Sequence, residues 1–421
     1  MTSIEDVICF REYQKTFWHL RFLPYYRQLD AEADEQFARI KTGLANAIVM
    51  REIRPAFMYY VTELNKFIEL YSLRFNKHDH IDLVNLMYKC LVEPDFDPDT
   101  FKLCAITLRT LLSYPRLLTP SDLALEWRPL YDIYVQMVFS KDDRLPKDAA
   151  SVGTFETTVN NCRYYFPLES TREILDEVRP FMHPFDDSMF RAMRCVAVFL
   201  PTRMNNFEHD QYGAKLWFEE MWHWFNTIDS KAAWEALVVQ LFSRLSSECC
   251  GYIQWNEKFD VIFTRLMRTL DLSVRKEQIS LGDGIGINRL DLSASWIVYM
   301  LGGKNDGAQS HLSRMLNSLE AYFHPSNTGL HTDRLLTFLL TLTNTFVRRV
   351  HQERFCRDGA AEISMEMRLT DEQIDLFVES ILPCAEWTVF TKSSNNSATP
   401  QIMKNLGFLS PGIVIPAILD M

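Results

Sequence analysis

Apolar residues recur at helical spacing along almost the whole chain, and this periodicity limits the fold more than any other feature. A stripe spaced by three or four residues lies on one side of an α-helix. The first such stripe comprises Ala33, Phe37, Ile40, Leu44 and Ala47, and the second, after Arg54-Pro55, comprises Phe57, Val61, Leu64, Ile68 and Tyr71. Pro55 suits the first turn of a helix, where its missing N–H leaves no bond unmade. We expect the two helices to form a hairpin.

The same signals for helix starts return along the chain. A proline stands shortly before an apolar helical stretch in Asp97-Pro98, Arg128-Pro129 and Arg179-Pro180. Capping-box spacing, in which two side chains satisfy free N–H groups at a helix start, occurs in Ser170 with Glu173 and Thr370 with Gln373. Strand-like fragments such as Ile413-Val414-Ile415 are short, and the following Pro416 disfavours a central strand. The fold class is therefore predicted to be all-α.

The organisation of these helices favours an α-solenoid of HEAT/armadillo-like antiparallel helix pairs. A helix pair with its turns occupies roughly 40 to 47 residues, which is the period of those repeats. No Gly/Ser linker separates two globules, and the irregular stretches at 280–289, 357–364 and 392–400 are short enough to be loop insertions. We expect a lead-in at 1–22 and a continuous array at 23–421. An irregular globular helical domain is the alternative, because no strict repeat consensus is visible.

Composition excludes several classes of function. The 421 residues carry 44 Lys and Arg against 55 Asp and Glu, a net charge of −11, whereas a nucleic-acid backbone needs a basic face. The nine cysteines form no C-x-x-C pair, so they are expected to be buried thiols in a reducing compartment. No stretch reaches the roughly 20 apolar residues of a membrane span, and the N-terminus does not read as a signal peptide. We expect no direct nucleic-acid partner and no membrane partner.

The candidate catalytic and metal motifs each have a simpler structural interpretation. The glycines at 282–286 lack the preceding strand of a dinucleotide loop, and Gly302-Gly303-Lys304 lacks the spacing of a phosphate loop and reads as a helix C-cap. In Lys77-His78-Asp79-His80 the two imidazoles diverge on a helix, and no third ligand is near. No nucleophile motif such as G-x-S-x-G accompanies the scattered polar residues of the C-terminal region, which are His311, His324, His331, His351, Ser313 and Asp333. Catalytic residues, metal ligands and a cofactor are not expected.

An aromatic cluster at 215–234 has two interpretations. Its rings could form a cage for a cation or an acetylated side chain. Packing between helices is the favoured alternative, with an indole N–H bonded to a polar neighbour at the edge. The residues expected in that core are Leu216, Met221, Trp224 and Phe225.

Arginines follow a long apolar stretch in FHPSNTGLHTDRLLTFLLTLTNTFVRRVHQER (323–354). The apolar residues predict one helix packed on a broad face, formed by Leu335, Leu339, Leu342, Phe346 and Val350. Cations near the C-terminal end of a helix meet the negative end of its dipole, which explains the arginines without a ligand. Because arginine also binds phosphate and carboxylate in bidentate fashion, an anion contact is a second hypothesis. Its residues are Arg348, Arg349 and Arg354.

Ten blocks in colinear order carry a resemblance to a known family. They include LPYYRQLDAEAD (23–34), LEWRPLYDIY (125–134), GYIQWN (251–256), FHPSNTG (323–329) and FVRRVHQER (346–354). The chain resembles the N-terminal part of the proteasome activator complex subunit 4 family, the large single-chain HEAT-repeat proteasome activators. The resemblance extends from about residue 23 to 421. Residues of about 320–421 correspond to the beginning of the family's middle HEAT region.

The resemblance implies a non-enzymatic function. Family members cap the end (alpha) ring of the 20S proteasome core particle and open its gate without ATP or ubiquitin. They favour peptides and unfolded or acetylated proteins, including histones, and are associated with the nucleus and cytoplasm, with DNA repair and with male germ-cell development (spermatogenesis). They also bind inositol phosphates in positively lined openings. The three arginines named above are the candidate contacts for such an anion in this chain.

Two departures from the family limit what the resemblance implies. The family's C-terminal docking tail, hydrophobic-Tyr-x, has no counterpart in Ile418-Leu419-Asp420-Met421, and the acetyl-histone-binding region belongs to sequence beyond this chain. We therefore expect a fragment, a truncated gene model or a short isoform rather than an autonomous activator. A HEAT-repeat scaffold resembling a nuclear transport receptor is the alternative function.

Overall fold

The computed structural model describes residues 25–93, 97–113, 117–140, 145–228, 233–270, 272, 289–303, 306–327, 330–355, 363–390 and 397–420. These residues form eighteen α-helices, joined by turns and a few short helical turns of other types, and they contain no β-strand. The all-α prediction is confirmed. Contacts divide the chain into two compact units between Ser170 and Thr171.

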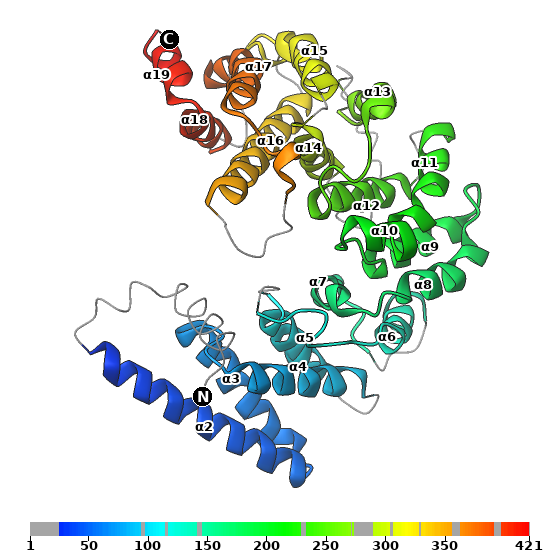
Figure 1. Ribbon diagram of the computed structural model, residues 1–421, viewed down its shortest axis with the longest axis vertical. Helices are drawn as coiled ribbons and strands as arrows, with labels where there is room; N and C mark the ends of the chain where they lie inside the picture. Colours follow the sequence, from blue (N-terminus) through cyan, green and yellow to red (C-terminus); the bar gives the residue numbers. More distant parts are fainter. Residues whose placement is uncertain are drawn as a thin grey trace. The chain divides into compact units, whose positions relative to one another are not determined.

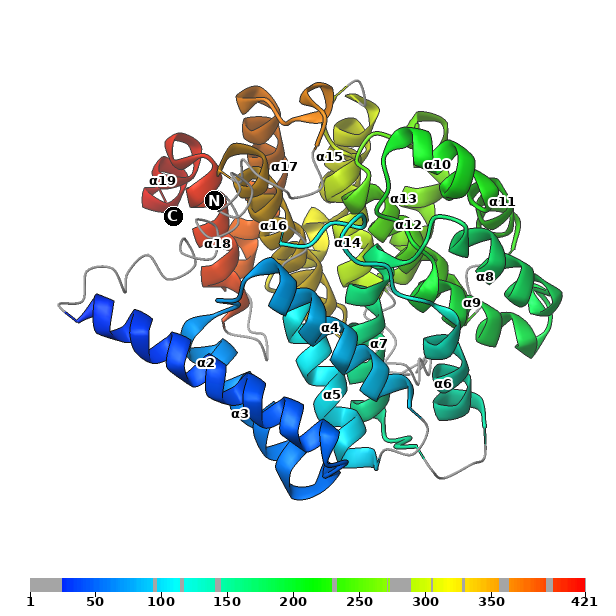
Figure 2. The ribbon, with the colours of Figure 1, turned by 60° about the horizontal axis from the view of Figure 1, so that its bottom comes forward.

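The first unit is built from three consecutive helix pairs (Figure 2). Its helices are α2 (Tyr26–Val49), α3 (Met58–Tyr71), α4 (Lys77–Val92), α5 (Pro98–Leu111), α6 (Arg128–Phe139) and α7 (Ala149–Cys162). The predicted hairpin is α2 with α3, and the apolar stripes of both helices, from Ala33 to Ala47 and from Phe57 to Ile68, are largely buried. Helices α3, α5 and α7 pack side by side as one row, and α4 packs on α6 in a second row.

The second unit repeats this scheme with more helices (Figure 1). Its helices are α8 (Ser170–Val178), α9 (Asp187–Phe199), α10 (Asn206–Tyr212), α11 (Phe218–Thr227), α12 (Glu235–Glu248), α13 (Phe259–Thr269), α14 (Arg289–Met300), α15 (Asp306–Phe323), α16 (Leu330–Phe355), α17 (Asp371–Phe390), α18 (Ala398–Leu409) and α19 (Pro411–Leu419).

Helices of the second unit stack on their second neighbours along the chain. Helices α12, α14, α16 and α18 form one row, and α13, α15, α17 and α19 form the other. Amphipathic helix pairs bury their apolar faces in this arrangement by contacting only the pairs before and after them. The two-row stacking is that of an α-solenoid, as the sequence predicted.

The signals for helix starts mostly act as expected. Asp97 caps α5 through its side chain, with Pro98 in the first turn. The Thr370–Gln373 capping box is present, since the Thr370 N–H donates to Gln373 Oε1 (3.1 Å) and the Gln373 N–H donates to Thr370 Oγ1 (3.2 Å). The Ser170 hydroxyl donates to the Pro167 carbonyl (2.5 Å). The strand-like residues 413–415 lie within helix α19.

The remaining expectations concern membrane spans and the continuity of the helical array. Within the described residues, no helix combines the length and the apolar character that crossing a membrane requires. The lead-in at 1–22, the glycine loop at 282–286 and Lys304 lie outside the described residues. That residues 23–421 form one continuous array stays a prediction.

Candidate functional site

The Arg349 side chain, predicted at the polar end of a helix, lies inside the second unit. It is fully buried, and its guanidinium donates to acceptors on three segments. Nη1 donates to the carbonyls of Val298 (2.5 Å) and Leu301 (2.8 Å) at the end of α14, and Nη2 donates to the Met367 carbonyl (2.7 Å). Because the last carbonyls of a helix lack partners within that helix, Arg349 caps α14 from the neighbouring helix α16.

Glu353, one turn further along α16, completes this cluster. Its Oε1 accepts from Arg349 Nε (2.7 Å) and its Oε2 accepts from the Leu369 N–H (2.9 Å), and the two charged side chains are 0% and 3% exposed. Burial of a charge is tolerated when it is paired and its remaining hydrogen-bonding atoms are satisfied. The pair therefore fastens the segment around Met367, which precedes α17, to the ends of α14 and α16.

The turn after α14 is shaped to admit this cluster. Gly302 has φ +91°, which favours glycine, and a Cβ there would lie 2.8 Å from the Met367 carbonyl oxygen. The same Cβ would lie 3.2 Å from Arg349 Nη2. The sequence prediction of a helix C-cap at Gly302-Gly303 is confirmed, and its close approach to residues 349 and 367 is the feature that spacing alone did not reveal.

The other two arginines of the proposed anion contact lie on the surface. Arg348 is exposed, and Arg354 forms an ion pair with Asp371 at the start of α17. The structure therefore does not bring Arg348, Arg349 and Arg354 together on one surface. Anion binding at the two exposed arginines stays a prediction.

The aromatic cluster of residues 215–234 is a core. Seven rings with neighbouring centroids 5.2 to 6.5 Å apart belong to Trp217, Phe218, Trp222, Phe225, Phe242, Trp255 and Trp296. Met221 and Phe225 are buried as expected, whereas Leu216 and Trp224 are only partly buried. Trp217, Phe218 and Trp222 are buried instead, because the buried face of α11 holds Phe218, Met221, Trp222 and Phe225, at spacings of three and four residues, and Trp224 lies beside it.

Polar groups around this cluster come from the chain itself. Lys258 Nζ lies 5.1 Å from the Trp222 ring centroid and 5.8 Å from that of Phe218, at cation–π distance. The Trp234 indole donates to the Pro184 carbonyl (3.3 Å), as expected of an indole at the edge. The buried Trp217 indole N–H has no acceptor among the described residues. Arg265 Cζ also lies 4.6 Å from the Phe225 ring centroid. The rings thus serve packing, and the described cations beside them, Lys258 and Arg265, belong to the chain itself.

The histidines at the start of α4 diverge as predicted. His80 is buried and its Nε2 lies 2.9 Å from the Leu111 carbonyl, and burial lowers the pKa of His80 to about 4. His78 is exposed and its Nδ1 lies 2.8 Å from Asp82 Oδ2. Ligand atoms of His78, Asp79 and Asp82 lie within 4.8 Å of one another. Asp79 pairs with Lys41 as well, and exposed acidic groups of this kind are common without an ion.

The C-terminal histidines do not form a catalytic set among the described residues. His324 Nδ1 lies 2.6 Å from Ser326 Oγ two residues on, which is a local turn contact, and its ring lies beside Trp387. His331 is buried against Tyr322, while His311 stacks on Phe263 between α13 and α15. These residues lie on separate faces of the helices, so a nucleophile, base and orienting acid do not converge there.

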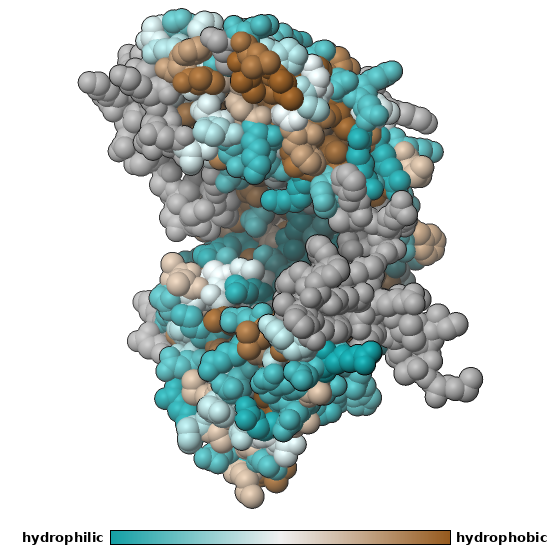
Figure 3. Space-filling model, turned by 90° about the vertical axis from the view of Figure 1, so that its left-hand side faces the viewer, coloured by the Kyte–Doolittle hydropathy of each residue, from teal (hydrophilic) through white to brown (hydrophobic). Residues whose placement is uncertain are grey.

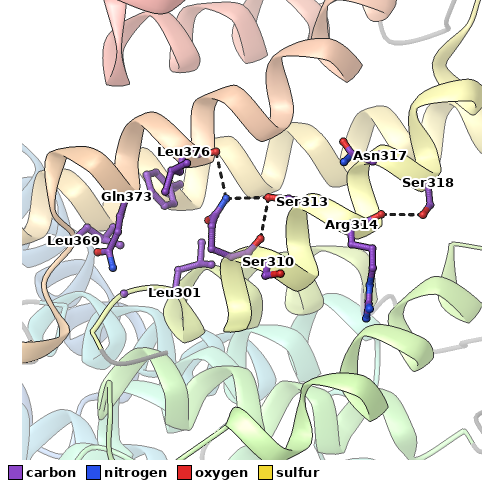
Figure 4. Close-up of a pocket in the computed structure, with 12 residues that line it drawn as sticks. Leu301, Ser310, Ser313, Arg314, Asn317, Ser318, Leu369, Gln373 and Leu376 are labelled. Carbon is purple, nitrogen blue, oxygen red and sulfur yellow. Dashed lines mark hydrogen bonds between the residues drawn. The ribbon is translucent and has the colours of Figure 1, made fainter. Parts of the chain in front are cut away.

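A hollow of about 830 Å³ beside α15 and α17 is a more promising site (Figure 4). One wall is polar and comes from one face of α15, with Ser310, Ser313, Arg314, Asn317 and Ser318. The other wall comes from the end of α14, from α16 and from the start of α17, and it is apolar except for one amide, with Leu301, Phe346, Leu369, Gln373 and Leu376. A hollow of this size with convergent polar groups suits a ligand or a short chain segment.

Gln309 joins the two helices beside this hollow. Its Nε2 donates to Ser380 Oγ (3.0 Å) and to the Leu376 carbonyl (3.3 Å) on α17. The Ser313 and Ser380 hydroxyls lie 2.7 Å apart. These bonds hold α15 and α17 at a fixed separation, so the hollow is built into the packing of the row.

Apolar side chains gather on the surface near the last helices (Figure 3). The exposed members include Phe408 on α18 and Ile415, Ile418 and Leu419 on α19, where of the residues of that helix only Val414 is buried. Contiguous apolar surface of this kind marks a contact with another element or molecule.

Comparison with known proteins gives this fold its context. The family model described as "Proteasome activator complex subunit 4, mid HEAT repeats region" matches residues 312–421. The chain is similar to proteasome activator complex subunit 4 of Homo sapiens, at 34% identity over 415 residues, and to proteasome activator complex subunit 4A of Danio rerio, at 36%. Each alignment covers 97% of this chain and 22% of the relative.

A plant relative is more distant. Proteasome activator subunit 4 of Arabidopsis thaliana is 25% identical over 315 residues, which covers 70% of this chain and 17% of the relative. The chain thus spans about a fifth of the length of the curated relatives that it matches.

Proposed function

The chain belongs to the proteasome activator complex subunit 4 family, and we propose that it forms one section of a HEAT-repeat cap that binds the end ring of the 20S proteasome core. The observation that carries this proposal is the alignment of 97% of the chain with proteins of that name. Two rows of stacked helices agree with it, because such arrays present long surfaces to large partners. The section is non-catalytic and contributes wall and interaction surface.

The proposed activity belongs to the assembled cap. It promotes ATP- and ubiquitin-independent degradation of peptides and of unfolded or acetylated proteins, including histones, in the nucleus and cytoplasm. This section supplies helices, whereas docking of the core particle and recognition of acetylated histones use other sections of the longer relatives. A HEAT-repeat scaffold resembling a nuclear transport receptor is the alternative.

A chimera tests the proposal. The section of the human relative that aligns with this chain is replaced by the 421 residues, and the chimera is mixed with 20S core particles. We expect it to co-sediment with the core and to stimulate hydrolysis of a fluorogenic peptide, whereas the human protein with that section deleted lacks part of the cap and does not stimulate hydrolysis. The isolated chain is expected to give no stimulation.

Two outcomes would contradict the proposal. A chimera that folds, as judged by circular dichroism and gel filtration, but does not sediment with the core would favour the scaffold alternative. Stimulation by the isolated 421 residues would show that the chain acts alone, contrary to its proposed role as one section.

We also propose that Arg348 and Arg354 contact an anion such as an inositol phosphate, since both are exposed and guanidinium groups bind phosphate in bidentate fashion. Isothermal titration with inositol hexakisphosphate should show weaker binding for the double variant Arg348→Gln/Arg354→Gln. Equal binding by the variant and the unchanged chain would leave both arginines with a role at the helix end only.

A further inference from the structure

The side chain of Met367 lies between the turns that follow two neighbouring helices of one row. It contacts Gly251, in the turn after α12, and Gly303, in the turn after α14. A Cβ on Gly251 would lie 2.6 Å from Met367 Cγ, and a Cβ on Gly303 would lie 2.5 Å from Met367 Sδ. Since real side chains do not approach so closely, the thioether occupies a notch that only glycine leaves open at both positions.

The backbone of these turns is shaped around the same residue. Among the residues that the structure describes, the glycines with positive φ are Gly251 (+89°), Gly302 (+91°) and Gly303 (+63°). A Cβ on Gly302 would lie 2.8 Å from the Met367 carbonyl oxygen, so all three glycines lie against Met367. Two turns that are far apart in sequence thus take up conformations that suit glycine where this one residue is docked.

Residues 363–369, which we call the strap, run across the C-terminal ends of three stacked helices. Met367 contacts the turns after α12 and α14. Arg349 and Glu353, near the end of α16, bond to the Met367 carbonyl and to the Leu369 N–H. Because α12, α14 and α16 are successive members of one row, the strap fastens that row in addition to the direct packing between its helices.

The strap lies where a small oxidant can reach it. Met367 is partly exposed, and the residues before it, 364–366, are exposed, with Met365 76% exposed. Hydrogen peroxide therefore reaches the thioether of residue 367 at the surface or when the strap opens locally. Oxidation of a methionine thioether requires no deprotonation, so it proceeds at neutral pH.

The thiols beside the notch are poorer targets for peroxide. Cys249 and Cys250 directly precede Gly251, and burial raises the pKa of Cys249 to about 12 and raises the pKa of Cys250 as well. Because the thiolate is the reactive form of cysteine, both side chains react slowly at neutral pH. Oxidation in this region is thus directed to methionine.

Oxidation changes the group that the notch must hold. The Met367 sulfur donates an electron pair to one oxygen of hydrogen peroxide, and the S–O bond forms as the O–O bond breaks. The second oxygen leaves as water with both hydrogens, so the sulfur is oxidised and the peroxide is reduced by the same electron pair. The sulfoxide is polar and favours water, whereas the notch holds an apolar thioether in close contact with glycine backbone.

We propose that Met367 is an oxidation site and that the strap is a redox-sensitive fastener of the row formed by α12, α14 and α16. As a thioether, Met367 docks in the notch and the strap is closed. As a sulfoxide, it leaves the notch and the strap opens, while the Arg349 bonds to Val298 and Leu301 stay because they do not involve the strap. The inference is independent of the proposed function, since it concerns the packing of the row.

The test is hydrogen–deuterium exchange, read by mass spectrometry, of the 421-residue chain before and after treatment with hydrogen peroxide. Met365→Leu leaves Met367 as the one methionine of the strap, and Met367→Leu, a change of similar volume, is the matched control that keeps Met365. In Met365→Leu, peroxide should add one oxygen to Met367 and speed exchange of residues 363–369 about tenfold. In Met367→Leu, oxidation of Met365 should leave that exchange within about twofold of its starting rate.

Reversal and location complete the test. Methionine sulfoxide reductases A and B should return the oxidised Met365→Leu protein to its starting exchange rate. Peptides covering 248–252 and 300–303 should follow the strap, whereas peptides of α5 in the first unit should not change.

Three results would overturn the proposal. The first is that Met367 stays unoxidised in the unchanged chain under conditions that oxidise Met365. The second is that oxidation of Met367 leaves exchange of the strap unchanged. The third is that peroxide speeds this exchange equally in folded Met367→Leu. Met365→Leu alters an exposed side chain, so the second result can be read even if Met367→Leu does not fold.

Discussion

Removal of the Arg349 side chain should lower the stability of the second unit strongly, and far more than removal of the neighbouring Arg348 side chain. In Arg349→Met the aliphatic volume is largely kept, but the buried Glu353 carboxylate loses its charge partner. Breaking a buried pair in this way costs about 3 to 5 kcal/mol. Three carbonyls, those of Val298, Leu301 and Met367, lose their donor as well, so the upper part of that range is expected.

The assay is hydrogen–deuterium exchange of peptides from α14, α16 and residues 363–370, which reports the free energy of local opening. A companion variant, Glu353→Met, removes the carboxylate and leaves the Arg349 guanidinium without its charge partner. The double variant Arg349→Met/Glu353→Met removes both charges. Because an apolar pair of similar volume is often tolerated in place of a buried ion pair, the double variant should be more stable than the sum of the two single losses indicates.

A matched control is available one residue away. Arg348→Met changes an exposed side chain and should alter the opening free energy by no more than about 0.5 kcal/mol. A cost below about 1 kcal/mol for Arg349→Met, or single losses that simply add in the double variant, would refute the interpretation of this pair as a structural clamp.

Three further predictions concern local structure. Gly302→Ala should destabilise the turn by about 1 to 3 kcal/mol, because the φ of Gly302 is +91° and the added Cβ would crowd the Met367 carbonyl. Thermal melts of this variant and of the control Gly412→Ala, at an open position, measure the loss of stability. His80 is neutral in the fold with a pKa of about 4 against about 6.5 when unfolded, so its stabilisation is complete above pH 6.5 and falls by up to ~3 kcal/mol toward pH 4. Hydrogen–deuterium exchange of α4 and α5 peptides should show this loss of stability at low pH. His80→Gln should abolish that part of the pH dependence. Asp97→Ala should cost about 1 kcal/mol through loss of the α5 cap, and unchanged exchange at the start of α5 would contradict that role.

The sequence predicted the helices well because each carries its own signal. The stripes around Leu44 and Leu64 are buried as their spacing indicates, and Pro98 and Thr370 mark helix starts through chemistry that is local to a few residues. Helical spacing fixes which residues share a face, and that face must be buried. The all-α class and the two-row stacking follow from these rules.

The candidate sites were harder to predict because they depend on partners far apart in sequence. Arg349 was placed with Arg348 and Arg354 from proximity in the chain, yet it turns inward to Val298, about fifty residues earlier. Trp222 lies in the aromatic core and Trp224 beside it, since Trp222 shares a face with Phe218, Met221 and Phe225 and meets Phe242 and Trp255 from other segments.

The hollow beside α15 and α17 illustrates the same division. Nothing in the sequence around Asn317 indicates a hollow, because its opposite wall comes from Leu301, Phe346 and Leu376 on three other segments. Local patterns determined by themselves which segments of this protein are helical and, for most of them, which faces they bury. Only the tertiary structure decided which buried charges meet and where a surface is hollow, because those features depend on the distances between helices, and helical periodicity carries no information about those distances.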